Sequence, residues 1–207
     1  MFFTPAGLAQ EIQSGIGDID AYYLPRARAG DVEAQYLLGL GYERGLSGTV
    51  DRRAAAKWYR DAAAAGHVTA AYRLGLLLLR GDSIEDDPKE AADFFRQAAA
   101  ENHPEALYYL GYLSERGLGV EADQAAALNF FERAAKLGLT AAMKAAASLQ
   151  VRRQDQPQDL TKAWYWLNLA ATAGDSEAGG MRSKLESMMT DNQLEEARAL
   201  TSSMFSE

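Results

Sequence analysis

The chain has 207 residues, of which 48% are hydrophobic and 24% charged, a composition that argues against a mainly disordered protein. Acidic residues outnumber basic ones by 29 to 21, and the net charge of -8 disfavours binding to nucleic acid. The sequence has no cysteine and only two histidines, which excludes disulfides, thiolate metal sites and a multi-histidine metal site within one chain. We therefore expect no metal and no cofactor. We also expect no membrane insertion, because no run approaches the roughly 20 apolar residues of a membrane-spanning helix.

The first 30 residues are expected to form an N-terminal cap or half repeat. Tyr22 and Tyr23 lie 36 residues before Trp58 and Tyr59, so they match the second half of a later unit. Pro25 should kink this helix or set its start. The segment lacks a basic region followed by an apolar core, so it is not predicted to be a secretory signal. We expect a cytoplasmic protein, with a periplasmic or secreted location as the alternative if a signal peptide has been removed.

The same residue types return every 36 residues through most of the chain. The recurring positions are Gly30, Gly66, Gly138 and Gly174; Ala34, Ala70, Ala106, Ala142 and Ala178; Asp51, Asp87, Asp123 and Asp159; and Trp58, Phe94, Phe130 and Trp166. This period is typical of helix-loop-helix repeats, which stack because a single helix pair cannot bury its apolar face alone. We predict an all-α solenoid with repeats at 31–66, 67–102, 103–138 and 139–174.

The first repeat illustrates how each unit is expected to fold. A helix is predicted over about 32–44, where Gly39 leaves space for another helix to approach. Gly45 is a natural stop, because glycine adopts the left-handed conformation at little cost. The Asp51 carboxylate can cap the second helix, which ends at Gly66.

The end of the chain departs from the pattern. The fourth repeat has less apolar volume in its first helix, where Lys144, Ala146, Ala147 and Gln150 replace Tyr36, Leu38, Gly39 and Tyr42. Residues 175–207 are expected to form C-terminal cap helices. Thr190 and Gln193 match a capping box, which predicts a final helix over about 191–203.

The motifs Ala34-Gln35-Tyr36-Leu37-Leu38-Gly39 and Trp58-Tyr59-Arg60-Asp61-Ala62-Ala63, with Asp51 between them, resemble the Sel-one-like repeat (SLR) family. This family is related to the tetratricopeptide repeat, and the resemblance covers about 31–178. It implies a right-handed α-solenoid whose first helices line a concave surface. It also implies a non-enzymatic adaptor or scaffold in protein complexes.

The face of the first helices opposite the packing stripe is the candidate partner-binding surface. Its aromatic and aliphatic members are expected to anchor a partner protein or peptide, and its charged members to form a rim. The candidate residues are Tyr36, Leu40, Glu43, Arg44, Tyr72, Leu76, Leu79, Arg80, Tyr108, Tyr112, Glu115, Arg116 and Lys144. Two structural alternatives remain open. The tyrosines can simply pack between adjacent repeats, and the arginines can complement the helix dipole from the last turn.

The histidines and the acidic loop favour structural roles over catalytic or metal-binding ones. His67 and His103 occupy the same repeat position, which indicates a structural role. The acidic loop at 82–87 lacks the ligand spacing of an EF-hand and is interpreted as a solvated loop with one capping aspartate. Phosphate-binding, nucleophile-elbow and zinc-protease motifs are missing from the sequence.

We therefore expect a protein-interaction module that is monomeric by itself. A narrower hypothesis is a bacterial immunity or chaperone-like protein that neutralises or escorts a toxin or effector. The remaining alternatives are a spacer in a larger assembly and a hydrolase with an active site in the groove.

Overall fold

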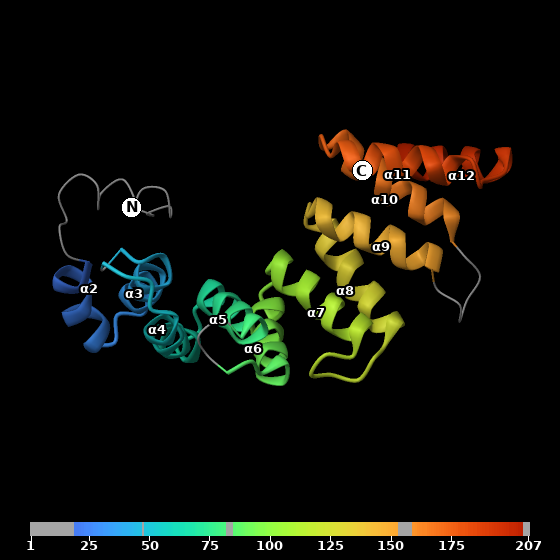
Figure 1. The fold of residues 1–207 in the computed structure, drawn as a ribbon. Helices are drawn as coiled ribbons and strands as arrows, with labels where there is room; N and C mark the ends of the chain where they lie inside the picture. Colours follow the sequence, from blue (N-terminus) through green and yellow to red (C-terminus); the bar gives the residue numbers. More distant parts are fainter. Residues whose placement is uncertain (1–18, 47, 82–84, 153–158, 205–207) are drawn as a thin grey trace. The chain divides into compact units, whose positions relative to one another are not determined.

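The computed structural model describes residues 19–46, 48–81, 85–152 and 159–204. For residues 202–204 it describes only the helical backbone. Within these ranges every regular element is an α-helix, so the predicted all-α repeat fold is confirmed (Figure 1). The helices are α2 (Ile19–Arg28), α3 (Val32–Arg44), α4 (Arg52–Ala64), α5 (Val68–Arg80), α6 (Pro88–Ala100), α7 (Pro104–Arg116), α8 (Gln124–Lys136), α9 (Thr140–Arg152), α10 (Leu160–Thr172), α11 (Ser176–Glu186) and α12 (Asp191–Met204). Most of the N-terminal half repeat, the tip of the acidic loop and the 153–158 loop lie outside the described residues.

The chain divides into two compact units, with unit 1 at 1–101 and unit 2 at 102–207. Unit 1 holds α2 to α6, and unit 2 holds α7 to α12. Within each unit, a first helix (α3, α5, α7 or α9) packs against the second helix that follows it (α4, α6, α8 or α10). Helix α11 packs against α10 in the same succession, and α12 also packs against α10.

Side-chain caps set where the helices begin. Asp31 and Asp175 accept the backbone N–H of the third residue of α3 and α11, each at 3.0 Å. His67 and His103 occupy the same repeat position and do the same with Nδ1. Each histidine is therefore a helix cap, a specific form of the structural role that the sequence suggested. The aspartates Asp51, Asp87, Asp123 and Asp159 cap the four second helices.

Close packing inside each pair depends on a glycine in the first helix. A Cβ atom added to Gly39 would lie 2.6 Å from two ring carbons of Tyr59, which belongs to α4. Gly75 faces Phe95 and Gly111 faces Phe131 in the same way, with nearest distances of 2.7 and 2.6 Å. The three rings are at most 1% exposed, so the space that glycine leaves is filled by an aromatic side chain. The fourth repeat differs, because Ala147 and Leu167 stand at these two positions.

Candidate functional site

In unit 1, the predicted surface is largely closed. Leu40 has no exposed surface and Tyr36 is 7% exposed, so the structure assigns both to the core and not to a free binding face. The Tyr36 ring stacks on the His67 imidazole at 4.4 Å between centroids and lies 6.0 Å from the Tyr59 ring. The alternative that a tyrosine packs between adjacent helices therefore describes Tyr36.

A polar network fills the gap between α3 and α5. The Tyr59 hydroxyl donates to Glu43 Oε2 at 2.5 Å, and Arg73 Nη1 donates to the same oxygen at 3.0 Å. Burial and the neighbouring Glu43 carboxylate raise the pKa of Tyr59 far above its usual value, so its hydroxyl keeps its proton. The Glu43 and Arg73 side chains are 21% and 22% exposed. Glu43 was predicted to lie on a charged rim, whereas here it neutralises Arg73 inside unit 1.

The other predicted residues of unit 1 are more accessible. Tyr72, Leu76 and Leu79 of α5 are half-buried, and the Tyr72 ring lies 6.2 Å from Phe95. Arg44 and Arg80 are exposed at the last turns of α3 and α5, the place where a cation complements the helix dipole.

In unit 2, the predicted residues share the face formed by α7, α9 and α11. Tyr108 packs edge-on against Tyr109 at 5.5 Å and is tilted over Phe131 at 5.6 Å. Burial raises the pKa of Tyr108 above its usual value. Tyr112 is half-buried beneath the exposed Arg116 guanidinium, whose central carbon lies 5.8 Å from the ring centroid.

Ion pairs tie the first helices of unit 2 together. Arg152 of α9 donates to Glu115 of α7 at 2.7 Å. Lys144 of α9 contacts Asp175 at 2.9 Å and Glu177 at 2.6 Å, at the start of α11. Hydrogen bonds to these carboxylates, Glu177 first, raise the pKa of Lys144, and the contact with Lys144 lowers the pKa of Asp175. Glu115 and Lys144 therefore hold neighbouring helices in place.

Two adjoining hollows lie on this face of unit 2. The more polar hollow, of about 320 Å³, is lined by Tyr108, Ala141, Lys144, Ala145, Ser148, Glu177 and Met181. The apolar hollow, of about 310 Å³, is lined by Ala147, Ser148, Val151, Arg152, Leu167, Met181, Lys184, Leu185 and Met188. Ser148 and Met181 line both hollows, so the two adjoin, and together we call them the α9/α11 groove.

The α11 side of the groove was missed by the sequence analysis, which treated 175–207 as a cap. The signal was present, because the 36-residue register continues: Asp175 and Ala178 match Asp31 and Ala34, and Met181 follows Ala145 by 36 residues. Helix α11 is thus a further first helix, and it contributes Met181, Lys184 and Leu185 to the groove. Met188, just after α11, is 53% exposed.

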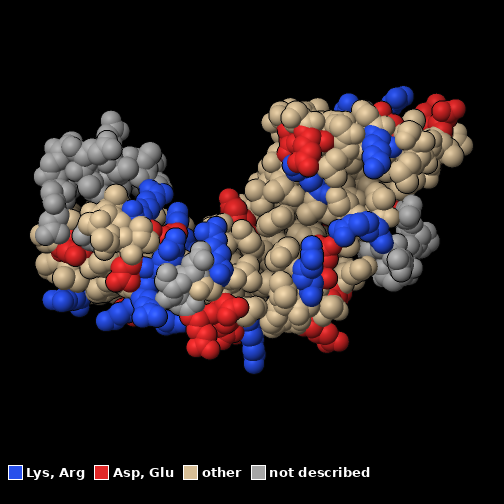
Figure 2. Space-filling view, viewed as in Figure 1, with Lys and Arg blue, Asp and Glu red and all other residues tan. Residues whose placement is uncertain are grey.

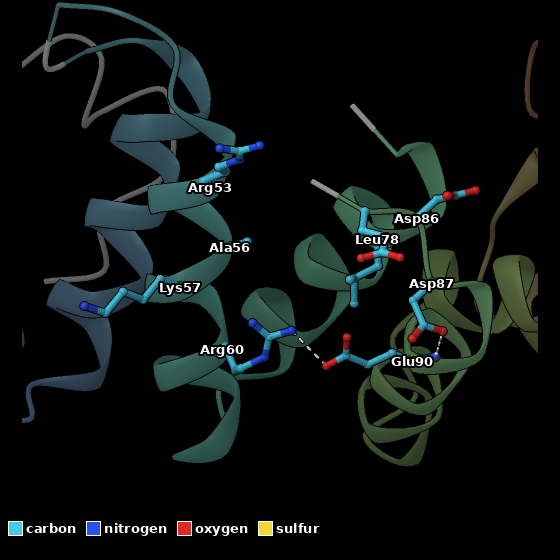
Figure 3. A pocket seen from close by; sticks show the side chains of 9 residues that line it. Arg53, Ala56, Lys57, Arg60, Leu78, Asp86, Asp87 and Glu90 are labelled. Atoms are coloured by element: carbon cyan, nitrogen blue, oxygen red, sulfur yellow. Dashed lines mark hydrogen bonds and ion pairs between the residues drawn. The ribbon is translucent and has the colours of Figure 1, made fainter. Parts of the chain in front are cut away.

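A separate hollow, in unit 1, is lined mainly by charged residues. Figure 2 shows basic side chains gathered over α4, and in Figure 3 Arg60 reaches toward Glu90 of α6 while the Lys57 side chain points away from the acidic residues. The charged residues that line this hollow are Arg53, Lys57, Arg60, Glu85, Asp86, Asp87 and Glu90. Arg60 already pairs with Glu90 at 2.8 Å, and Asp87 caps α6 as predicted. Cations and carboxylates in similar number largely neutralise each other, which leaves little net attraction for a charged partner.

Metal and membrane sites were searched for in the described part of the chain. No group of three or more histidine or carboxylate side chains there is arranged to hold a metal ion. None of the described helices combines the length and the apolar character needed to cross a membrane.

The repeats themselves match a known family. The Sel1 repeat model matches four segments, at residues 32–67, 68–103, 104–139 and 141–175. No curated protein is significantly similar to the chain in sequence.

Solved structures with the same fold include a protective antigen present in uropathogenic Escherichia coli strains and a Sel1 repeat protein from Oxalobacter formigenes. The first is 31% identical with a TM-score of 0.78, and the similarity covers 87% of this chain but 39% of the antigen. The second is 28% identical with a TM-score of 0.72, and covers 83% of this chain and 74% of the other. With family matches over more than half of its residues, the chain belongs to the Sel1 repeat family.

Proposed function

We propose that this protein binds a segment of a partner protein through the first-helix face of unit 2, formed by α7, α9 and α11. Proteins built from Sel1 repeats generally mediate protein-protein interactions, and the fold is typically a non-catalytic scaffold. The single observation that carries the choice of surface is the α9/α11 groove, which lies on the predicted partner-binding face.

The chemistry of the groove suits a peptide chain. Methionine side chains are flexible and polarizable, and so adapt to varied partner shapes; Met181 and Met188 supply them here. Ala145 and Ser148 are small, which lets a partner backbone come close to α9. The half-buried Tyr108 and Tyr112 add aromatic surface, a residue type that is enriched where proteins bind each other.

The matching surface of unit 1 is less suitable for binding. Tyr36 and Leu40 are buried there, and the Tyr59–Glu43–Arg73 network fills the gap between α3 and α5. A partner would have to break these hydrogen bonds in order to enter, at the cost of leaving charged groups unpaired. We therefore assign binding to unit 2 and retain Tyr108, Tyr112, Arg116 and Lys144 from the predicted set.

Affinity capture from the native host, with variants, tests this function. Met181→Glu places a carboxylate in the middle of the groove, and Met188→Glu does so at its more exposed end. Each variant should lose most of the partner that the wild-type chain retains, while the helical circular-dichroism melt stays close to wild type. Asn129→Glu, an exposed change on the second helix α8, is the matched control and should capture normally.

Several outcomes separate the narrower roles. Loss of capture by Asn129→Glu alone, or equal capture by all the variants, would contradict a site on the α7–α9–α11 face. Recovery of a toxin or effector would favour the immunity or escort role, and recovery of a stable complex would favour an adaptor. The cytoplasmic location stays a prediction, which cell fractionation checks against the periplasmic or secreted alternative.

A further inference from the structure

The α9/α11 groove lies where other repeats place large side chains. Along the first helices, the position of Ser148 is occupied by Leu40, Leu76 and Tyr112. On the second helices, the position of Leu167 is occupied by Tyr59, Phe95 and Phe131, each almost fully buried. The fourth repeat thus has smaller side chains at both positions, and both positions line the apolar hollow.

The neighbouring positions have changed from polar to apolar. Where the gap between α3 and α5 has Glu43 and Arg73, the gap between α9 and α11 has Val151 and Met181. Both line the apolar hollow, together with Ala147, Leu185 and Met188. A hollow with these walls offers almost no hydrogen bonds to water, so an apolar side chain that enters it gains free energy by leaving solvent.

The charged residues that line the apolar hollow are both cations. They are Arg152 and Lys184, and no carboxylate is among the lining residues. Arg152 is partly neutralised by Glu115, although its side chain remains 62% exposed. In the described part of the chain, no carboxylate pairs with the exposed Lys184 ammonium. An anionic group next to the bound apolar side chain would therefore meet a complementary charge.

We infer that the α9/α11 groove receives one bulky apolar side chain from a partner segment whose flanking residues are acidic. The partner's side chain would take the space that the Leu40 side chain occupies in unit 1, and its carboxylates would face Lys184 and Arg152. This inference rests on the proposed function and adds the chemistry of the partner to it.

Three synthetic peptides provide the probes. Each carries one central leucine, flanked on both sides by glutamates, by serines or by lysines. Binding is followed through the methyl signals of Met181 and Met188 in NMR spectra. The glutamate peptide should bind at least about tenfold more tightly than the lysine peptide, and its affinity should fall with added salt. Replacing the central leucine by glycine should abolish binding.

Two variants locate the bound peptide. Ser148→Leu restores the residue found at this position in the first two repeats and should weaken binding of the glutamate peptide about tenfold or more, without lowering the thermal melt. Lys184→Glu should weaken the glutamate peptide several-fold and leave the serine peptide nearly unchanged. Asn129→Leu, an exposed change on the second helix α8 and outside the groove, is the control.

The inference fails if the three leucine peptides bind equally, or if Ser148→Leu leaves their affinity unchanged. It also fails if sodium dodecanoate binds in the groove while none of the peptides does, because the occupant would then be a lipid. A failed inference remains distinct from a failed function: if Met181→Glu and Met188→Glu still abolish partner capture, the face binds a protein of other chemistry. If neither variant affects capture, the proposed function itself is wrong.

Discussion

The gap between α3 and α5 in unit 1 and the gap between α9 and α11 in unit 2 are built from equivalent positions with opposite results. In unit 1, Tyr36, Leu40, Glu43, Tyr59 and Arg73 close the space with an aromatic stack and a charged hydrogen-bond network. In unit 2, Lys144, Ser148, Val151, Leu167 and Met181 leave a groove. Helices α3 and α9 both have 13 residues, so helix length does not decide whether the gap is open. The side chains at a few positions do.

The largest expected loss of stability comes from the close packing of α3 against α4, where Gly39 faces the Tyr59 ring. Gly39→Ala in unit 1 places a Cβ 2.6 Å from the Tyr59 ring, so the ring or the helix must move. We expect the free energy of unfolding to fall by about 1–3 kcal/mol, measured by urea denaturation. Gly180→Ala is the control, because a Cβ there meets no atom within 4 Å. Alanine has the higher helix propensity, so Gly180→Ala should be neutral or stabilising. A loss as large as that of Gly39→Ala would contradict close packing as the cause.

The polar network of unit 1 should yield the next largest effect. Glu43→Val leaves Arg73 and the Tyr59 hydroxyl without their shared acceptor in a partly buried place, and should cost about 1–2 kcal/mol of unfolding free energy. The double variant Glu43→Val with Arg73→Met installs the pair found in unit 2 and should recover part of that loss. If the double variant loses more unfolding free energy than the two single variants lose together, this comparison is contradicted.

A smaller effect is expected at the acidic caps. Asp31 and Asp175 occupy the same repeat position, and the pKa of each is lowered. The main cause for Asp31 is the Ala34 backbone N–H, whereas for Asp175 it is the hydrogen bond from Lys144. Since the folded pKa lies below the unfolded one, each carboxylate stabilises the fold above the unfolded pKa. That contribution disappears as the pH falls through the folded pKa.

The variant Lys144→Gln separates the two caps. It should raise the pKa of Asp175 toward its usual value and leave that of Asp31 unchanged, as read from carboxyl NMR titrations. Because less stabilisation then remains to be lost, the stability of unit 2 should depend less on pH in the acidic range. A fall in the pKa of Asp175, or a parallel shift at Asp31, would show that Lys144 is not the cause.

Much of the fold could be predicted because the residues that define it act locally. Aspartate caps, glycine stops and the alanine stripe recur at fixed positions, and each depends on neighbours in the same helix pair. The glycine at Gly39 was correctly interpreted as a site of close helix approach, although the ring that fills it, Tyr59, was identified only by the structure.

The site was harder to predict because it depends on contacts between successive repeats. Tyr36 and Leu40 lie on the expected face of α3, but partners such as His67 turn that face into a core. The groove in unit 2 required recognising α11 as a further first helix. Gly179 and Gly180 of α11, and the change from Ala145 to Met181, hide the repeat pattern, because few apolar residues of α11 recur at the 36-residue interval.

The pairing of glycine with an aromatic ring has a consequence for how such proteins diversify. The groups that hold two helices together lie between them, whereas the groups that open or close a groove point toward the next repeat. Exchanges at a handful of positions can therefore turn a sealed junction into a receptor, and among these only the aromatic position also belongs to the pairing inside a repeat. New ligands then become accessible without inventing a new scaffold.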